Sequence, residues 1–356
     1  MDSIIQQLSE QVRSAAADKR PLCVRGGGTK DFYGHPVQGD RLDTTAYRGI
    51  VDYSPTELVI SVRAGTPLAD VEAATLEKGQ MLAFEPPHFG SAATLGGCVA
   101  AGLSGPRRAQ TGAVRDFVLG VRMLDGRGRD LRFGGQVMKN VAGYDVSRLM
   151  AGALGTLGVL TEISLKVLPR PVAETTLQLE ATPADAIRMM NEWAGCPLPI
   201  TATCYFEGTL TVRLAGAQAA VDKARRDLGG ATIADGASFW SDLREQRLSF
   251  FAGDTPLWRL SVKSTTAPLD LPGTQLIEWG GALRWLKSDA PAEAVRKAAA
   301  NSGGHATLFR ATDKAAGVFH PLAPAILSLH RRLKQALDPE GILNPGRMYP
   351  DIPSSK

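Results

Sequence analysis

The sequence predicts an α+β fold with a layered N-terminal domain over residues 1–171 and a smaller antiparallel domain over residues 172–320, followed by residues 321–356. Strands and helices alternate along the first part, which indicates stacked layers. Pro169 and Pro171 interrupt the pattern and mark the boundary. Beyond them the elements follow roughly a βαββαβ order, which is typical of a ferredoxin-like antiparallel sheet with helices on one face.

In the first part, the boundaries of the elements follow from hydrophobic patterns and from breaker residues. Thr66 suits the N-cap of a helix, Pro67 suits its first position, and Gly79 ends it. A DGRG turn at 125–128 joins two strands. We expect a helix over 3–17, strands over 21–25 and 58–62, the helix from Pro67 to Lys78, strands over 117–124 and 130–133, and a strand over 158–168.

The second part repeats short strands and helices. Its last helix is amphipathic, with Leu322, Ile326, Leu329 and Leu333 along one side. The expected elements are a strand over 175–180, a helix over 183–193, a hairpin over 201–206 and 209–214, a helix over 217–228, strands over 258–263, 275–279 and 282–287, a helix over 290–302, a strand over 306–310 and the helix over 322–337.

Composition excludes several classes of protein. With 356 residues, 44% of them hydrophobic, the chain can bury a large core. The net charge of +4 suits anionic ligands and is too weak to indicate a nucleic-acid partner. The N-terminus lacks a secretory pattern, and no stretch is long and apolar enough to span a membrane. We expect a cytoplasmic protein, and attachment to the inner face of the cell membrane through a partner is left open.

Four cysteines occur, and none falls in a CxxC pair or in an iron–sulfur run. The expectation is reduced thiols, as in a cytosolic protein. The residues are Cys23, Cys98, Cys196 and Cys204.

The segment RGGGTK at 25–30 follows a predicted strand. Three glycines permit positive φ angles and leave backbone N–H groups free to converge on an anion, such as a pyrophosphate. Thr29 adds a hydroxyl and Lys30 a positive charge. A tight turn without a ligand is the alternative. The segment is neither a Walker A loop nor a GxGxxG dinucleotide motif.

Further segments rich in glycine and small residues lie at 94–105 (TLGGCVAAGLSG), 140–145 (NVAGYD) and 155–159 (GTLGV). Such residues let the backbone approach a ligand or a neighbouring element closely. Several of these segments in one domain are more than turns alone require. A long, thin ligand touched at many backbone points would account for them.

These motifs, in the order GGGT, TLGGCVAAGLSG, TGAVRDFVLGVRML and KNVAGYDVSRLMAGALGTLGVLTEISLKV, resemble the FAD-binding domain of the vanillyl-alcohol oxidase / p-cresol methylhydroxylase (PCMH) superfamily. The ending DPEGILNPGRMY resembles its 2-hydroxy-acid dehydrogenase branch, and SGGHATLFRA is similar to the family of FAD-binding subunits of bacterial glycolate oxidases. The resemblance covers residues 20–171 and the last twenty. Each motif alone is weak, but their joint order is specific.

The resemblance implies a PCMH-type FAD-binding domain of two subdomains, a small ferredoxin-like cap, and a C-terminal helix and tail that return to the FAD domain. It also implies cofactor contacts. The pyrophosphate would lie against Arg25, Gly26, Gly27, Gly28, Thr29 and Lys30. The flavin and diphosphate would be lined by Thr94, Gly96, Gly97, Gly102, Ser104 and Gly105, with Gly112 near the same path. The adenine and ribose would lie against Gly155, Gly158 and Val159.

The same resemblance gives Tyr144 and Asp145 a supporting role and brings Asn344 to the edge of the isoalloxazine ring. Some family members attach FAD through a histidine after the glycine triplet. Here that place holds Thr29 and Lys30, so we expect non-covalent FAD.

Oxidation of a 2-hydroxy acid such as glycolate to glyoxylate needs a hydride acceptor, a base for the hydroxyl proton and a cation or metal for the carboxylate. His305 is the best candidate base, because it precedes a strand that should face the flavin. His88 is a second candidate, and His330 is expected to be solvated. The alternatives are an ordinary hydrogen-bonded histidine for His305 and a loop residue without a catalytic role for His88.

Related dehydrogenases carry an HGDGN stretch and paired histidines that bind a divalent metal, and this sequence has neither. No metal site can be read. The family picture implies a complex, in which a larger FAD-containing subunit oxidises the 2-hydroxy acid and an iron–sulfur subunit accepts electrons. Two alternatives stay open: a non-catalytic assembly subunit that keeps the flavin fold, and a stand-alone FAD-dependent reductase that uses NADPH.

Overall fold

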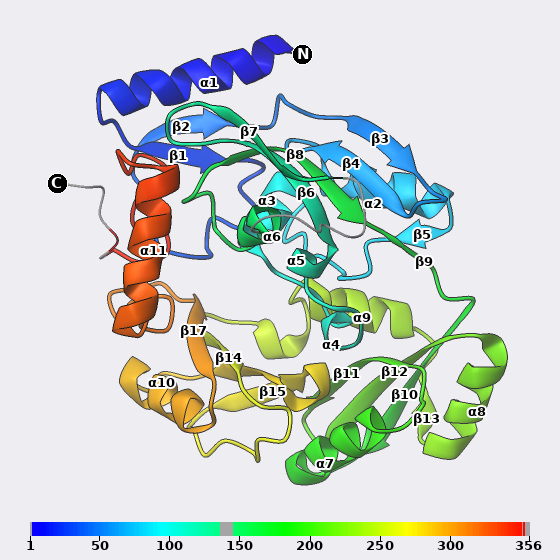
Figure 1. Ribbon diagram of the computed structural model, residues 1–356. Coiled ribbons are helices and arrows are strands. Elements are labelled where there is room, and N and C mark those ends of the chain that lie inside the picture. The colour runs from blue at the N-terminus through cyan, green and yellow to red at the C-terminus, as the bar shows by residue number, and fades with distance from the viewer. Residues whose placement is uncertain (1, 136–144, 351, 353–356) are drawn as a thin grey trace. The chain divides into compact units, whose positions relative to one another are not determined.

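The computed structural model describes residues 2–135, 145–350 and 352 of the chain. Its contacts divide the chain into two units (Figure 1). Unit 1 comprises residues 1–103, 113–169 and 321–356. Unit 2 comprises residues 104–112 and 170–320. The short stretch 104–112 therefore groups with the second half of the sequence, whereas the sequence pattern placed it in the first domain.

An antiparallel sheet of five strands forms the centre of unit 1. Strand β8 lies in its middle and pairs with β4 on one side and β6 on the other. In order across the sheet, the strands are β3 (Ile50–Ser54), β4 (Val59–Arg63), β8 (Val159–Lys166), β6 (Val118–Leu124) and β7 (Asp130–Gly134). Helices α2 (Leu68–Glu77) and α3 (Leu95–Ala101) share one hydrophobic core with these strands.

A second layer of unit 1 contains β1 (Leu22–Arg25), which pairs in parallel with β2 (Asp40–Asp43). Helix α1 (Asp2–Ala17) places Ile5, Leu8, Val12 and Ala15 in the core beneath these strands, at the spacing of one helical face. Leu343, from the C-terminal segment, joins the same core and forms a parallel bridge with Leu22. The segment around Leu343 thus extends the layer that carries the first glycine loop.

The remaining elements of unit 1 are short or peripheral. They are β5 (Gln80–Met81), which pairs with β9 (Leu168–Pro169), and helices α5 (Val114–Phe117), α6 (Val146–Leu149) and α11 (Pro324–Leu337).

Unit 2 is built on one eight-stranded antiparallel sheet. Across the sheet the order is β13-β10-β12-β11-β15-β16-β14-β17. The bounds are β10 (Ala173–Glu180), β11 (Ile200–Phe206), β12 (Thr209–Gly216), β13 (Ala231–Thr232), β14 (Leu257–Ser261), β15 (Thr274–Glu278), β16 (Leu283–Lys287) and β17 (His305–Arg310).

The order of these strands shows two ferredoxin-like halves. The strands β10 to β13 have the order 4-1-3-2, and the strands β14 to β17 have the order 2-3-1-4. The halves meet where Cys204 of β11 pairs with Glu278 of β15. The sequence pattern predicted one such sheet. The second half is harder to read because the described loop 262–273 replaces the helix that would connect β14 to β15.

Three helices cover one face of this sheet (Figure 1). They are α7 (Pro183–Ala194) and α8 (Gln218–Leu228) over the first half, and α10 (Ala292–Asn301) over the second. Helix α9 (Gly236–Arg244) lies on the other face, where the Trp240 indole N–H donates to the Thr176 hydroxyl at 2.9 Å. Helix α4 (Arg108–Thr111) and two 3-10 turns, Ser249–Phe251 and Trp279–Gly281, complete unit 2.

The predicted α+β class is confirmed, and most predicted elements occur within a few residues of their expected bounds. One cap was wrong: α2 begins at Leu68, and the Thr66 hydroxyl instead donates to the Arg63 carbonyl at 2.7 Å and accepts from the Gly49 N–H at 2.8 Å. Helix α3 was missed because its composition is that of a loop. None of the helices in the described part of the chain is long and apolar enough to cross a bilayer.

Candidate functional site

A groove in unit 1 brings together glycine segments that are far apart in the sequence. The first loop, the start of α3, the segment before β8 and the C-terminal segment all contribute to its walls. The predicted residues that line it are Arg25, Gly27, Gly28, Thr29, Lys30, Thr94, Gly96, Gly97, Gly155, Gly158 and Asn344. The sequence motifs therefore converge in space, as a single elongated ligand would require.

Other predicted cofactor residues are placed elsewhere. Gly26 faces the Thr94 hydroxyl, and a Cβ on it would lie 2.5 Å from that oxygen. Gly102 ends α3 with φ +68° and contacts Gly152. Val159 begins β8 and is fully buried in the core under α1. These residues support the groove from behind and do not line it.

Three further predicted contacts, Ser104, Gly105 and Gly112, belong to the stretch that groups with unit 2. The Gly105 carbonyl accepts a hydrogen bond from the Trp279 indole at 3.1 Å, and Gly112 ends α4. The sequence motif is thus divided between the two units.

Of the supporting pair, Tyr144 lies outside the described residues. Asp145 caps α6, and its carboxylate accepts hydrogen bonds from the Arg148 N–H at 3.0 Å and the Ser147 hydroxyl at 2.7 Å. Its role is therefore to start a helix, as an N-cap carboxylate does.

The first loop exposes backbone donors to the groove. None of the described residues accepts a hydrogen bond from the N–H groups of Gly27, Gly28 or Thr29. Gly28 has φ +74°, a left-handed conformation that favours glycine. Successive free N–H groups in a turn of this kind form a concave site for an anion. A negatively charged group in the groove would accept hydrogen bonds from these donors.

Most glycines around the groove are also required by the packing of the protein. A Cβ on Gly27 would lie 1.5 Å from the Ala92 carbonyl oxygen, and one on Gly158 would lie 2.0 Å from the Met123 methyl carbon. The sequence pattern attributes their small size to the ligand. The structure shows that close contacts between loops and strands require it independently of any ligand.

Positive side chains surround the first loop. The Arg25 guanidinium pairs with Asp31 at 2.5 Å, which raises the pKa of Arg25. Lys30 is buried, and its ammonium donates to the His88 carbonyl at 3.1 Å. The Arg347 guanidinium donates to the Lys30 carbonyl at 3.2 Å, and burial lowers its pKa. Three cations and one carboxylate leave a positive balance that favours an anion.

Arg347 was missed by the sequence analysis. Its only signal was its place in the ending LNPGRMY, three residues after Asn344. Asn344 itself lines the groove, but its amide is engaged on both sides. The Asn344 Nδ2 donates to the Leu154 carbonyl at 2.7 Å, and its Oδ1 accepts from the Val24 N–H at 2.7 Å. This side chain ties the first loop's strand to the segment before β8.

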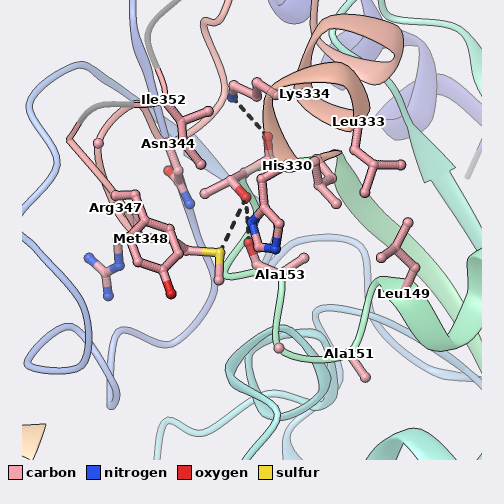
Figure 2. A pocket seen from close by; sticks show the side chains of 15 residues that line it. Leu149, Ala151, Ala153, His330, Leu333, Lys334, Asn344, Arg347, Met348 and Ile352 are labelled. Atoms are coloured by element: carbon pink, nitrogen blue, oxygen red, sulfur yellow. Dashed lines mark hydrogen bonds between the residues drawn. The ribbon is translucent and has the colours of Figure 1, made fainter. Parts of the chain in front are cut away.

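A second cavity of unit 1, of about 230 Å³, lies beside α11 and shares Asn344 and Arg347 with the groove (Figure 2). The other walls are mainly apolar. His330 meets Tyr349 edge-to-face, with ring centroids 5.9 Å apart. Burial lowers the pKa of His330 and raises that of Tyr349. His330 is therefore half-buried, whereas the sequence predicted a solvated ring.

The candidate base His305 is the first residue of β17 in unit 2, and it is exposed. Partial desolvation by neighbouring residues still lowers the pKa of the His305 imidazole, and the positive charge of Arg259 lowers it further. His88, the second candidate, lies in unit 1 with its Nε2 3.0 Å from the Glu72 carboxylate. Within residues 2–135, 145–350 and 352, no three His, Cys, Asp or Glu side chains form a group that could hold a metal.

Comparison with known sequences gives two family matches. Residues 4–134 match the model of an FAD binding domain, and residues 312–348 match that of the C-terminal domain of FAD linked oxidases. The chain is 54% identical to the glycolate oxidase subunit GlcE of Escherichia coli (strain K12), over 98% of both chains. It is 31% identical to the glycolate oxidase subunit GlcD of Bacillus subtilis (strain 168), over 48% of this chain and 37% of GlcD.

Comparison with solved structures supports the fold. A p-cresol methylhydroxylase structure matches with a TM-score of 0.69 and 16% identity, over 98% of this chain and 88% of that one. An alkyldihydroxyacetonephosphate synthase structure matches with a TM-score of 0.67 and 16% identity, over 96% of this chain and 74% of that one. The predicted PCMH-type fold and FAD-binding domain are confirmed.

Proposed function

Since the chain belongs to the family of the glycolate oxidase subunit GlcE, we propose that it binds FAD without a covalent bond and serves as one flavin subunit of an oxidase of glycolate or a related 2-hydroxy acid. The relative's printed name supports both the substrate and the membership of a complex. The groove of unit 1 supports the cofactor.

The observation that carries this proposal is a set of N–H groups within a positive groove, those of Gly27, Gly28 and Thr29, which have no acceptor among the described residues. A pyrophosphate is an anion with several acceptor oxygens, so it can satisfy these donors together. Arg347 and Lys30 stabilise its charge. Of the cofactor contacts inferred from the sequence, we retain those that line the groove.

When bound, FAD supplies a hydride acceptor, and the chain's own residues hold it and exclude water from it. Thr94 supports the groove by accepting a hydrogen bond from the Gly97 N–H at 3.2 Å, which fixes the start of α3. Asn344 and the segment 154–158 form the opposite wall. These contacts position the cofactor without any covalent bond.

The composition of the groove favours the non-covalent mode. Among the described residues that line it there is no histidine, and Thr29 and Lys30 follow the glycine triplet. Cys23 is the one thiol in the lining. Precipitating the purified flavoprotein with acid tests the mode directly: the yellow colour is expected in the supernatant. Flavin that stays with the pellet, and that is lost on Cys23→Ala, would show a thioether instead.

For catalysis we propose His305 as the base. Its lowered pKa keeps the imidazole neutral at pH 7, so that it can accept the hydroxyl proton of a 2-hydroxy acid. The likeness to GlcD supports a larger FAD-containing partner subunit. The chain has no iron–sulfur run, so we place the cluster that accepts the electrons in a third subunit.

Co-purification with associated proteins, followed by flavin and iron analysis, tests this assignment. We expect flavin in this chain, iron in a partner, and bleaching of the flavin by glycolate in the complex. A colourless chain that still assembles would support the assembly role, and bleaching of the isolated chain by NADPH would support a reductase. His305→Gln should slow bleaching without releasing FAD; an unchanged rate would remove His305 from the mechanism.

A further inference from the structure

Helix α11 buries a charged side chain at a position where an apolar core residue is expected. Lys334 is its one buried residue, with 6% of its surface exposed. The apolar residues Ile326 and Leu329 of the same helix are 46% and 47% exposed. The half-buried Leu327, Leu333 and Leu337 contribute some hydrophobic burial, and the contacts of the buried lysine add to it in fixing the position of this helix.

The Lys334 ammonium uses all three of its hydrogen-bond donors on protein acceptors. It donates to the Thr156 carbonyl at 2.8 Å, to the Leu343 carbonyl at 2.8 Å and to the Asp338 carboxylate at 2.6 Å. Figure 2 shows the first of these bonds as the dashed line that begins at the ammonium. A buried ammonium that is fully satisfied in this way fixes the atoms around it in one arrangement.

Two of these acceptors hold the walls of the flavin groove. Thr156 lies between Gly155 and Gly158, which line the groove. Leu343 lies beside Leu22 of β1, where the Leu22 N–H donates to the Ile342 carbonyl at 2.7 Å. Strand β1 leads directly into the first glycine loop. Lys334 thus connects the two walls from behind, without lining the groove itself.

Asp338 balances the charge and is fully buried. Its carboxylate accepts hydrogen bonds from the Leu343 N–H at 2.8 Å and the Ile342 N–H at 3.2 Å. Burial lowers the pKa of Lys334, and Asp338 opposes that shift. A buried ion pair is often no more stabilising than apolar residues of the same size, so a gain in stability alone does not explain this pair.

We propose that Lys334 is a positioning residue for FAD, which holds the 154–158 wall and the β1 wall at the separation that the cofactor needs. This inference rests on the proposed binding of FAD and adds to it a residue that touches no ligand. It also connects the flavin groove to α11, on which Ile326 and Leu329 are exposed.

Lys334→Met tests the proposal, because methionine keeps the apolar stem and removes the ammonium. We expect the Kd for FAD to rise by about tenfold or more, since the groove must be ordered when FAD binds. In the apoprotein, hydrogen exchange should accelerate at the amides of residues 154–158. Lys334→Met/Asp338→Asn removes both buried charges and gives the same comparison if the single variant does not fold.

Arg122→Met is the matched control. Arg122 lies in the same unit, pairs with Asp130 at 2.7 Å and Glu162 at 3.0 Å, and does not line the groove. The Arg122→Met variant should have a lower unfolding midpoint, whereas its Kd for FAD and its hydrogen exchange at residues 154–158 should be unchanged. Equal effects of the two variants on FAD affinity would overturn the proposal. Failure of the wild-type chain to bind FAD would instead overturn the proposed function.

Discussion

The two walls of the groove in unit 1 are built on different principles. The first loop, 25–30, presents backbone donors of its own, with the N–H groups of Gly27, Gly28 and Thr29 directed to no described acceptor. The second wall, 154–158, has two of its carbonyls held from the C-terminal segment, by Asn344 and by Lys334.

The difference separates recognition from positioning. The first wall contains the groups that recognise an anion, and the left-handed conformation of Gly28 lets the loop present them. The second wall contributes small residues, and side chains 178 and 190 positions away in sequence fix its place. Substitutions in the first wall should therefore affect folding or anion binding directly. Substitutions of Lys334 or Asn344, which hold the 154–158 wall, should act on FAD affinity by changing how well that wall is ordered.

The largest expected effect is on the first wall. Gly27→Ala brings a Cβ to 1.5 Å from the Ala92 carbonyl oxygen, so the two loops must separate. We expect a loss of about 3 kcal/mol or more in the free energy of unfolding of the apoprotein, measured in urea.

Gly79→Ala is its control. Gly79 has φ +68°, and a Cβ on it would meet no atom within 4 Å, so alanine there costs about 1 kcal/mol from the backbone alone. If Gly27→Ala were no more destabilising than Gly79→Ala, the packing reason for the glycine would be wrong.

The next largest effect is expected at Asn344, whose side chain contacts both walls. Asn344→Ala removes the bonds to Leu154 and Val24 and should cost about 2–3 kcal/mol, because it leaves buried backbone groups unpaired. Asn344→Asp distinguishes the contact with one wall from the contact with the other. It keeps an acceptor for the Val24 N–H and loses the donor to the Leu154 carbonyl. Hydrogen exchange should rise at 154–158 and stay slow at Val24; a rise at Val24 alone would contradict this division.

The smallest expected effect is at Arg347. Arg347→Gln removes a cation from the groove and should raise the Kd for FAD about tenfold, or roughly 1.4 kcal/mol. It also removes the guanidinium bond to the Lys30 carbonyl, so we expect a loss in the free energy of unfolding that is smaller than for Asn344→Ala. Arg41→Gln is the matched control, because Arg41 is exposed on β2 and does not line the groove. Titration of both apoproteins with FAD makes the comparison, and equal affinities would show that Arg347 does not act on the ligand.

The sequence predicted the glycine loop that supplies the hydrogen-bond donors better than the side chains that hold the walls of the groove. Local patterns identify the glycine loop because its signal lies within six residues, RGGGTK. The role of Lys334 could not be predicted, since the sequence pattern of an amphipathic helix indicates a solvated lysine. Only the fold brings the carbonyls of Thr156 and Leu343 to it. Helix α3 was missed for a related reason: Gly96 and Gly97 disfavour a helix, and contact with Ala64 overrides that preference.

The physical reason for each glycine around the groove could not be inferred from the sequence either. A glycine near a ligand and a glycine against a neighbouring strand give the same pattern in sequence. Only the fold shows that Gly158 faces Met123 and that Gly96 faces Ala64.

The central claim is that the first loop holds the pyrophosphate of FAD through its backbone. A crystal structure of the FAD complex tests it most directly. We predict pyrophosphate oxygens within about 2.7–3.2 Å of the backbone nitrogens of Gly27, Gly28 and Thr29, with the Arg347 guanidinium beside them. A complex in which these nitrogens face only solvent and the pyrophosphate lies against other residues would contradict the account.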